Sequence, residues 1–259
     1  MTDEGKEQIM IKTKSSLQLL SSKGHISVEV IHPQLQENSL AVIVCVHGGP
    51  GGDRRGNGNI FIELSNAAAL HGFTILLFDF YGSGTSDGKP EEYDIESQIS
   101  DLKTVVAFTQ KTYGQPIHLV GESMGATIVV AADIPRIASQ VLLWPAFDLL
   151  ETDLAPYFTL EWQEKVARDG ILSDNGLILG SNLYSQILNY DYEALYDLKI
   201  SSLLIHGRAD NEVPAQQSIR AASVSSAFVN LILYPEGGHG LRLKSVRRSV
   251  LDAIFGFLK

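Results

Sequence analysis

Short apolar runs separated by polar and glycine-rich stretches recur along this chain of 259 residues. A run of about four to eight aliphatic residues bounded by turn residues is typical of a buried strand. The pattern predicts eight strands, of which the first two form a hairpin. They span residues 16–21, 25–32, 40–46, 73–80, 116–120, 140–144, 200–205 and 228–234.

Helical periodicity fills most of the segments between the later strands. The predicted helices span residues 60–71, 95–113, 124–133, 214–226 and 241–259. Strands that alternate with helices in this way indicate an α/β fold with a mostly parallel, doubly wound sheet of eight strands. Because ligands bind beyond the carboxyl ends of the strands in such sheets, the residues that follow the strands are the first candidates for a functional site.

The segment between the sixth and seventh strands is too long for a single crossover helix. We predict that residues 146–199 form a small cap inserted into a core of residues 1–145 and 200–259. Ten acidic and only three basic residues lie in this segment, and we expect such a charge balance to repel polyanionic substrates. Eight of the chain's 21 aromatic residues also lie there, which indicates either a core for the cap itself or an aromatic pocket for a substrate.

Composition and charge limit the possible partners and compartments. A hydrophobic content of 44% is enough for one such core with an insertion, and a formal net charge of −10 argues against binding to nucleic acid or to an anionic membrane face. No apolar segment approaches the roughly 20 residues of a membrane span, and the first ten residues are too charged for a secretory signal. The single Cys45 excludes an internal disulfide. These features predict a cytoplasmic protein, and the oligomeric state is left open.

Neither a metal ion nor a cofactor is expected from the residue pattern. One cysteine and scattered histidines provide no zinc-binding spacing, and no helix begins with the Gly-Lys-Ser or Gly-Lys-Thr of a phosphate-binding loop. Cys45 lies inside an apolar run, so we interpret it as a buried structural thiol.

The stretch "HLVGESMGAT" places Ser123 between a predicted strand and a predicted helix. Glycine at 121 and 125 relieves the crowding of such a sharp turn, which holds the serine exposed above the sheet as a candidate nucleophile. The helix that begins there directs free N–H groups and its positive dipole end at the same place. The same five-residue pattern recurs around Ser86, but without an adjoining strand and helix, so we interpret Ser86 as a loop serine.

A serine nucleophile needs a neutral imidazole to accept its proton and a carboxylate to hold that imidazole. His239 is the best candidate for the base, because it lies in a glycine-rich loop directly after the last strand; His206 is a weaker alternative. Asp210 is the favoured acid, because the chain order Ser123, Asp210, His239 is the order expected for this architecture. Asp148 is the second candidate, since it follows the sixth strand.

These motifs together resemble the α/β-hydrolase superfamily over nearly the whole chain. They are Gly121-Glu122-Ser123-Met124-Gly125, His47-Gly48-Gly49-Pro50-Gly51-Gly52, Gly207-Arg208-Ala209-Asp210 and Gly238-His239-Gly240. The Glu-Ser-Met centre, the "FDFYGSGTSDG" loop and the short insert resemble in particular the serine aminopeptidase-like or monoglyceride-lipase-like group, which includes cinnamoyl and feruloyl esterases. The resemblance implies an α/β-hydrolase fold with the cap after strand 6.

The resemblance also implies an oxyanion hole. In the family pattern its donors are the backbone N–H groups of the residue after the nucleophile, here Met124, and of the residue after the His-Gly pair, here Gly49, with Gly48 as an alternative. Each such donor is typically worth about 3 to 4 kcal/mol in the transition state.

The motif set favours a serine carboxylesterase that cleaves small or medium acyl or aryl esters through an acyl-enzyme intermediate. An acyl thioesterase would use the same chemistry. An aminopeptidase of the proline iminopeptidase type is the other alternative, because "HGGPGG" resembles the oxyanion loop of those enzymes and an acidic cap could hold a free amino terminus. A binding protein without catalytic activity is disfavoured, because it would not need a nucleophile, a base and an oxyanion loop together.

Overall fold

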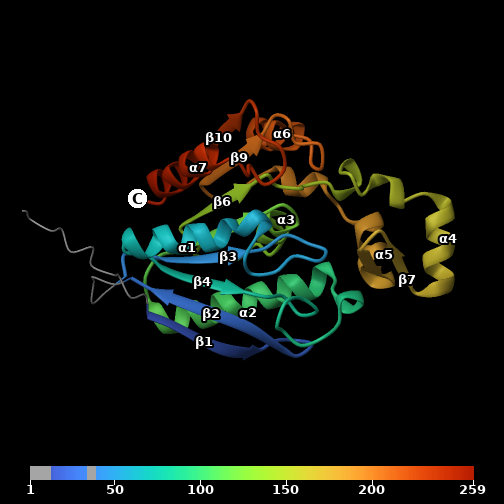
Figure 1. Ribbon diagram of the computed structural model, residues 1–259, viewed down its shortest axis with the longest axis horizontal. Helices are drawn as coiled ribbons and strands as arrows, with labels where there is room; N and C mark the ends of the chain where they lie inside the picture. Colours follow the sequence, from blue (N-terminus) through green and yellow to red (C-terminus); the bar gives the residue numbers. More distant parts are fainter. Residues whose placement is uncertain (1–12, 34–38) are drawn as a thin grey trace, which may run out of the picture.

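The computed structural model describes residues 13–33 and 39–259, and its centre is a sheet of eight strands (Figure 1). The strand order is β1-β2-β4-β3-β5-β6-β9-β10, in which β1, β2 and β4 pair antiparallel and the other neighbours pair parallel. The predicted eight-stranded, mostly parallel sheet is therefore confirmed. The strands are β1 Thr13–Leu20, β2 His25–His32, β3 Val42–Val46, β4 Thr74–Phe78, β5 Ile117–Glu122, β6 Ser139–Leu143, β9 Ser202–Gly207 and β10 Val229–Tyr234.

Helices cover both faces of the sheet, because the parallel strands are apolar on both sides. Buried side chains of α1 and α7 pack in one hydrophobic cluster, whereas those of α2, α3 and α6 pack in another on the opposite face. The α/β fold class with a doubly wound sheet is thus confirmed. The helices are α1 Ile60–Leu70, α2 Ile95–Tyr113, α3 Met124–Ala131, α6 Gln216–Val224 and α7 Lys244–Phe257.

The segment between β6 and β9 lies beyond one end of the sheet, where Figure 1 shows it in yellow and gold. It contains two α-helices and a two-stranded hairpin that is separate from the main sheet, and the division into core and cap stays a prediction. Its elements are η3 Leu149–Glu151, η4 Ala155–Tyr157, α4 Leu160–Asp169, β7 Ile171–Asp174, β8 Leu177–Gly180, α5 Ser181–Asn189 and η5 Glu193–Tyr196.

The hairpin β7–β8 was not among the predicted strands, although the sequence contains a signal for it. Asn175 and Gly176 connect its strands, and both adopt a positive φ, of 46° and 86°. Asn-Gly between two short apolar runs is a strong signal for this type of two-residue turn.

The predicted strand ends differ from the observed ones by a few residues: β1, β5 and β9 extend beyond one predicted end, whereas β3 and β4 are shorter than predicted. β1 begins at Thr13, three residues earlier than predicted, since it pairs with β2 along its whole length. β5 extends to Glu122 and β9 to Gly207, which places both strand ends next to candidate site residues.

No helix within residues 13–33 and 39–259 is both long and apolar enough to cross a membrane. The first ten residues, on which the prediction about a secretory signal depends, lie outside the described residues. The single thiol, Cys45, is buried in the hydrophobic cluster of α1 and α7, and burial raises its pKa well above the ordinary value.

Candidate active site

Ser123 forms the sharp turn between β5 and α3. Its φ of 52° is positive, a conformation that costs a non-glycine residue about 1–3 kcal/mol and that clusters at functional sites. A Cβ atom at Gly121 would lie 2.8 Å from Cα of Ala126, and one at Gly125 would overlap the carbonyl group of Val46. Both flanking positions therefore require glycine for the steric reason that the sequence suggested.

Ser123 and His239 line one cavity of about 470 Å³. A glycine-rich loop that follows β3, residues 48–59, supplies most of the wall, and Glu122 and Glu212 complete it. The cavity lies beyond the carboxyl ends of β3, β5, β9 and β10, where ligands bind in sheets of this kind. Its volume is in the range of pockets that hold small organic ligands.

The ring of His239 is held by the buried Asp210. Nδ1 of His239 donates a hydrogen bond to Oδ2 of Asp210 at 2.9 Å, while Oδ1 accepts from the backbone N–H groups of Glu212 and Val213 at 3.0 and 2.9 Å. Burial would raise the pKa of Asp210, but the hydrogen bonds from His206 and His239 hold it well below its usual range. An ionised Asp210 can only accept, so Nδ1 carries the proton and Nε2 of the neutral ring is free to accept one.

His206 contacts the same carboxylate from a fully buried position. Its Nε2 lies 3.3 Å from Oδ2 of Asp210 and 3.0 Å from the carbonyl oxygen of Val213, and its Nδ1 lies 2.8 Å from Oγ of Ser218. Both ring nitrogens therefore have structural partners. This geometry favours His239 over the weaker alternative, His206, as the base.

Asp148 takes part in a different set of contacts. Its carboxylate accepts from the N–H of Leu150 at 2.8 Å, and its backbone is hydrogen-bonded to the Gln217 side chain in both directions. It caps the short helix η3 and is not the hydrogen-bond partner of His239. The geometry therefore favours Asp210 over Asp148 as the acid.

Ser123 and His239 share the cavity, but no hydrogen bond joins their side chains in the described structure. Nε2 of His239 lies 3.9 Å from Oε2 of the half-exposed Glu212. Hydrogen bonds between catalytic groups are often long in unliganded enzymes and shorten when substrate binds. Glu212 is a site residue that the sequence did not single out, although it lies two positions after Asp210.

The surroundings of His239 predict how activity should depend on pH. Burial alone would lower the pKa of His239, but the hydrogen bond and charge of Asp210 and the charges of Glu212 and Glu122 raise it above the ordinary value. A base must be neutral to accept a proton, so kcat/KM should fall as pH decreases through this raised pKa. In a profile from pH 5 to 9, we expect the acidic limb above the value of about 6.5 that an unperturbed histidine would show. An acidic limb below that value would contradict the environment described for His239.

Two backbone N–H groups near Ser123 have no protein acceptor in the described part of the chain. They belong to Gly49 and Met124, the two residues predicted to form the oxyanion hole. Gly48, the alternative, donates its N–H to Oε1 of Glu122 at 3.0 Å and is therefore occupied. A Cβ atom at Gly49 would overlap the buried Tyr93 hydroxyl, which makes glycine a requirement at that position.

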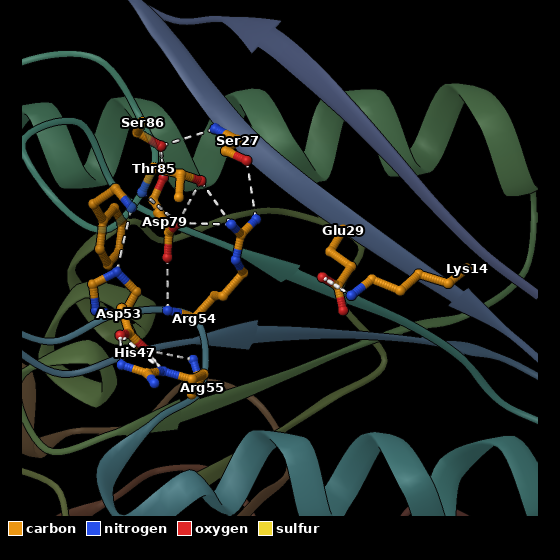
Figure 2. A network of polar contacts seen from close by, with 11 residues as sticks. Lys14, Ser27, Glu29, His47, Asp53, Arg54, Arg55, Asp79, Thr85 and Ser86 are labelled. Carbon is orange, nitrogen blue, oxygen red and sulfur yellow. Dashed lines mark hydrogen bonds and ion pairs between the residues drawn. The ribbon is translucent and has the colours of Figure 1, made fainter. Parts of the chain in front are cut away.

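A polar network anchors the middle of the glycine-rich loop, at Arg54, to the loop after β4 (Figure 2). The buried Asp79 accepts from the backbone N–H groups of Arg54 and Thr85 at 2.8 and 2.9 Å and lies 3.3 Å from the Arg54 guanidinium. The Ser86 hydroxyl donates to the carbonyl oxygen of Asp79 and accepts from the N–H of Ser27. Ser86 therefore has structural partners, as expected for a loop serine.

The aromatic residues of the segment between β6 and β9 pack mainly on one another. Ring pairs join Phe158 to Tyr184 at 4.9 Å, Tyr157 to Trp162 at 5.4 Å and Phe147 to Tyr196 at 5.4 Å. None of the eight lines the cavity at Ser123. This arrangement favours the interpretation that they form a core for the segment itself.

Among the residues that the structure describes, no group of three histidine, cysteine, aspartate or glutamate side chains is arranged to hold a metal ion.

The chain is similar in sequence to one protein family and to several individual proteins. A family model described as alpha/beta hydrolase fold matches residues 41–134. The chain is 26% identical over 207 residues to the uncharacterized protein YfhR of Escherichia coli O157:H7 and 29% identical over 221 residues to the uncharacterized protein Rv2307c of Mycobacterium tuberculosis, matches that cover 78% and 84% of this chain. It is 25% identical over 200 residues, 73% of this chain, to the human mitochondrial palmitoyl-protein thioesterase ABHD10. The matches span 64% of the length of YfhR and of ABHD10 and 69% of Rv2307c.

Solved structures show the same fold at low sequence identity. Est1E from Butyrivibrio proteoclasticus with bound ferulic acid superposes with a TM-score of 0.80 at 20% identity, over 93% of this chain and 97% of that one. A putative hydrolase from Agrobacterium vitis S4 superposes with a TM-score of 0.76 at 20% identity, over 96% of this chain and 100% of that one.

The sheet order, the turn at Ser123 and these comparisons define the chain as an α/β hydrolase in fold. The predicted resemblance to the α/β-hydrolase superfamily is confirmed.

Proposed function

We propose that this protein is a serine carboxylesterase that cleaves small or medium acyl or aryl esters through an acyl-enzyme intermediate. The observation that carries the proposal is the arrangement around one cavity: Ser123 on a strained turn and His239 held by the ionised Asp210. The N–H groups of Gly49 and Met124, which have no acceptor among the described residues, support it further.

In the proposed reaction, Oγ of Ser123 attacks the ester carbonyl carbon while Nε2 of His239 accepts the hydroxyl proton. The carbonyl oxygen becomes an oxyanion, which the N–H groups of Gly49 and Met124 stabilise. The C–O bond to the alcohol then breaks, and the imidazolium of His239 gives its proton to the leaving alcohol. Water attacks the acyl-enzyme by the same route and releases the carboxylic acid.

Asp210 contributes by holding His239 in the correct tautomer and by stabilising the imidazolium. The two backbone N–H groups that bind its Oδ1 and the contact with His206 keep the carboxylate in place. A fixed carboxylate of this kind needs no reorganisation when the ring becomes charged.

The relatives support an acyl-transfer function without selecting the leaving group. Est1E was solved with ferulic acid, an aryl acid, and ABHD10 is named a palmitoyl-protein thioesterase. An acyl thioesterase is therefore the alternative with the same chemistry. A specific observation also favours an aminopeptidase as a second alternative: Asp53, Glu122 and Glu212 give the cavity three carboxylates against the single Arg55, a charge balance that attracts an ammonium group.

Substrate charge and salt separate these alternatives. We expect the neutral p-nitrophenyl esters to be hydrolysed with a kcat/KM that is nearly independent of ionic strength, because they carry no charge for the cavity carboxylates to act on. An acyl-CoA should be a poor substrate at low salt and improve at high salt, since the screening length falls from about 30 Å at 0.01 M to about 3 Å at 1 M. The measurement is kcat/KM for an aryl ester, an alkyl ester, an acyl-CoA and a prolyl-arylamide at both ionic strengths.

Two results of this measurement would favour one of the alternative functions over the esterase. Fastest turnover of the prolyl-arylamide, with slowing at high salt, would contradict the esterase proposal and support the aminopeptidase. Fastest turnover of the acyl-CoA at both salt concentrations would support the thioesterase.

A further inference from the structure

Glu122, the residue before Ser123, is a buried carboxylate that accepts three hydrogen bonds. Its Oε1 accepts from the backbone N–H groups of Gly48 at 3.0 Å and Asn57 at 3.1 Å, and its Oε2 accepts from the indole N–H of Trp144 at 3.0 Å. The residue is 3% exposed and lines the cavity beside Ser123. These contacts join three parts of the chain that are far apart in the sequence.

Two of the donors belong to the glycine-rich loop that carries the proposed oxyanion donor. Gly48 directly precedes Gly49, and Asn57 lies near the other end of that loop in η1 Asn57–Asn59. The far side of Asn57 is also held, because its carbonyl oxygen accepts from the Arg247 guanidinium at 2.9 Å. Glu122 therefore binds the N–H group of Asn57 at the cavity, while Arg247 binds the carbonyl oxygen of the same residue.

The third donor is the indole N–H of Trp144, whose ring packs against His239. Trp144 follows β6, is fully buried and has a positive φ of 38°. Its indole lies edge-on against the His239 ring, with the ring centroids 6.2 Å apart and an interplanar angle of 66°. A bulky residue in this backbone conformation persists only where its surroundings hold it, and the hydrogen bond to Glu122 is one such restraint.

We propose that Glu122 is a positioning residue. Through Gly48 and Asn57 it holds the glycine-rich loop that carries Gly49, and through Trp144 it fixes the position of that loop relative to the His239 ring. This role rests on the proposed function of the site. Neither the fold comparison nor the serine motif assigns it, because the position between Gly121 and Ser123 is variable in the G-x-S-x-G pattern.

A carboxylate suits this position better than an amide of the same shape. All three neighbours are donors, and an ionised carboxylate accepts at both oxygens. A glutamine would accept at one oxygen and direct an NH₂ group at the remaining donor, so one pair of N–H groups would face each other without an acceptor between them. Buried donors left without an acceptor in this way destabilise the arrangement.

The charge of Glu122 also acts on His239 through space. It is one of the negative charges that raise the pKa of His239, so its removal should lower that pKa. Among the described residues, the charged or titratable groups around His239 and Glu122 include Asp210, Glu212, Asp153, His47, Tyr93 and Arg247.

The first test is Glu122→Gln, assayed with a neutral p-nitrophenyl ester. We expect kcat to fall by about 10- to 100-fold with KM changed by less than about threefold, because a misplaced oxyanion loop affects the transition state more than the bound substrate. The acidic limb of the kcat/KM profile should move to lower pH, since His239 loses a neighbouring negative charge. Unchanged kcat together with an unchanged acidic limb would overturn the proposal.

The second test repeats Glu122→Gln in a Trp144→Phe background. Phenylalanine has no indole N–H, so the glutamine can keep its oxygen toward Gly48 and Asn57 and direct its NH₂ group where no donor remains. We expect the loss in kcat caused by Glu122→Gln to be at least about fivefold smaller in this background than in the wild type. Equal losses in both backgrounds would contradict the coupling through Trp144.

A matched control separates positioning from general destabilisation. Asp101 is another buried carboxylate; it accepts from the N–H of Tyr81 at 2.8 Å and lies outside the cavity. We expect Asp101→Asn to lower the melting temperature while the acidic limb stays in place. If Asp101→Asn shifts the acidic limb as much as Glu122→Gln does, the effect is not specific to Glu122.

An NMR measurement tests the contact independently of turnover. The chain has two tryptophans, so the indole N–H signal of Trp144 can be assigned from its loss in Trp144→Phe. We expect this signal to shift in Glu122→Gln while that of Trp162 stays unchanged. An unmoved Trp144 signal would overturn the proposal even if esters are hydrolysed, whereas a shifted signal in a protein that hydrolyses no ester would contradict the proposed function alone.

Discussion

Ser123→Ala is expected to lower kcat for ester hydrolysis by about six orders of magnitude, the loss seen when the nucleophile of a serine hydrolase is removed. The reason is that, among the described residues, no other side chain that lines this cavity carries a hydroxyl to form the acyl-enzyme, although the oxyanion donors remain. The fold should stay intact, because alanine can replace the side chain without changing the backbone partners of the turn. The measurement is single-turnover hydrolysis of a p-nitrophenyl ester, with circular dichroism to check the fold.

A fluorophosphonate probe provides the matched comparison between the two serine motifs. We expect the probe to label the wild type and Ser86→Ala at Ser123, as located by peptide mass spectrometry, and to leave Ser123→Ala unlabelled. Ser86→Ala should reduce stability modestly, because the hydroxyl links Asp79 to Ser27. Labelling at Ser86 would show that the choice between the two motifs is wrong.

Asp210→Asn is expected to lower kcat by about four orders of magnitude. An asparagine amide can donate to Nδ1 of His239, which places the proton on Nε2 and leaves the ring unable to accept the serine proton. The raised pKa of His239 should also fall, since Asp210 contributes both a hydrogen bond and a negative charge to it.

Asp148→Asn is the control, because Asp148 caps η3 and has no hydrogen bond to His239. We expect at most a severalfold change in kcat for this variant. If Asp148→Asn proves more damaging than Asp210→Asn, the acid has been placed after the wrong strand.

The fold was predictable because its signal is local. Apolar runs such as the one that forms β3 Val42–Val46 are buried on both faces, and this burial is visible as a continuous hydrophobic stretch. The helix α2 Ile95–Tyr113 matches its predicted bounds, since Asp94 caps one end and Gly114, with a positive φ, ends the other. The hairpin β7–β8 was missed because its strands are short and lie outside the main sheet, where the alternation with helices gives no guidance.

Some features of the candidate site were also predictable from local sequence, whereas others depend on tertiary contacts. The residue types at Ser123, Asp210 and His239 were selected by their places after strands, and the glycines at 121 and 125 by the crowding of a sharp turn; both are properties of neighbouring residues. Which carboxylate meets His239, by contrast, depends on how the loops after β6, β9 and β10 fold over the sheet.

By itself, the sequence determined the alternation of strands and helices, the turn at Ser123 and the loop positions of the candidate acid and base, because each follows from periodicity or from the steric needs of adjacent residues. Only the tertiary structure decided that Asp210 holds His239, that Gly48 is occupied while Gly49 is free, and that Glu122 meets Trp144. Each of these is a contact between residues that lie between 22 and 74 positions apart. Such contacts depend on hydrogen-bond distances of about 3 Å, which strand order and loop packing set and which no local pattern encodes.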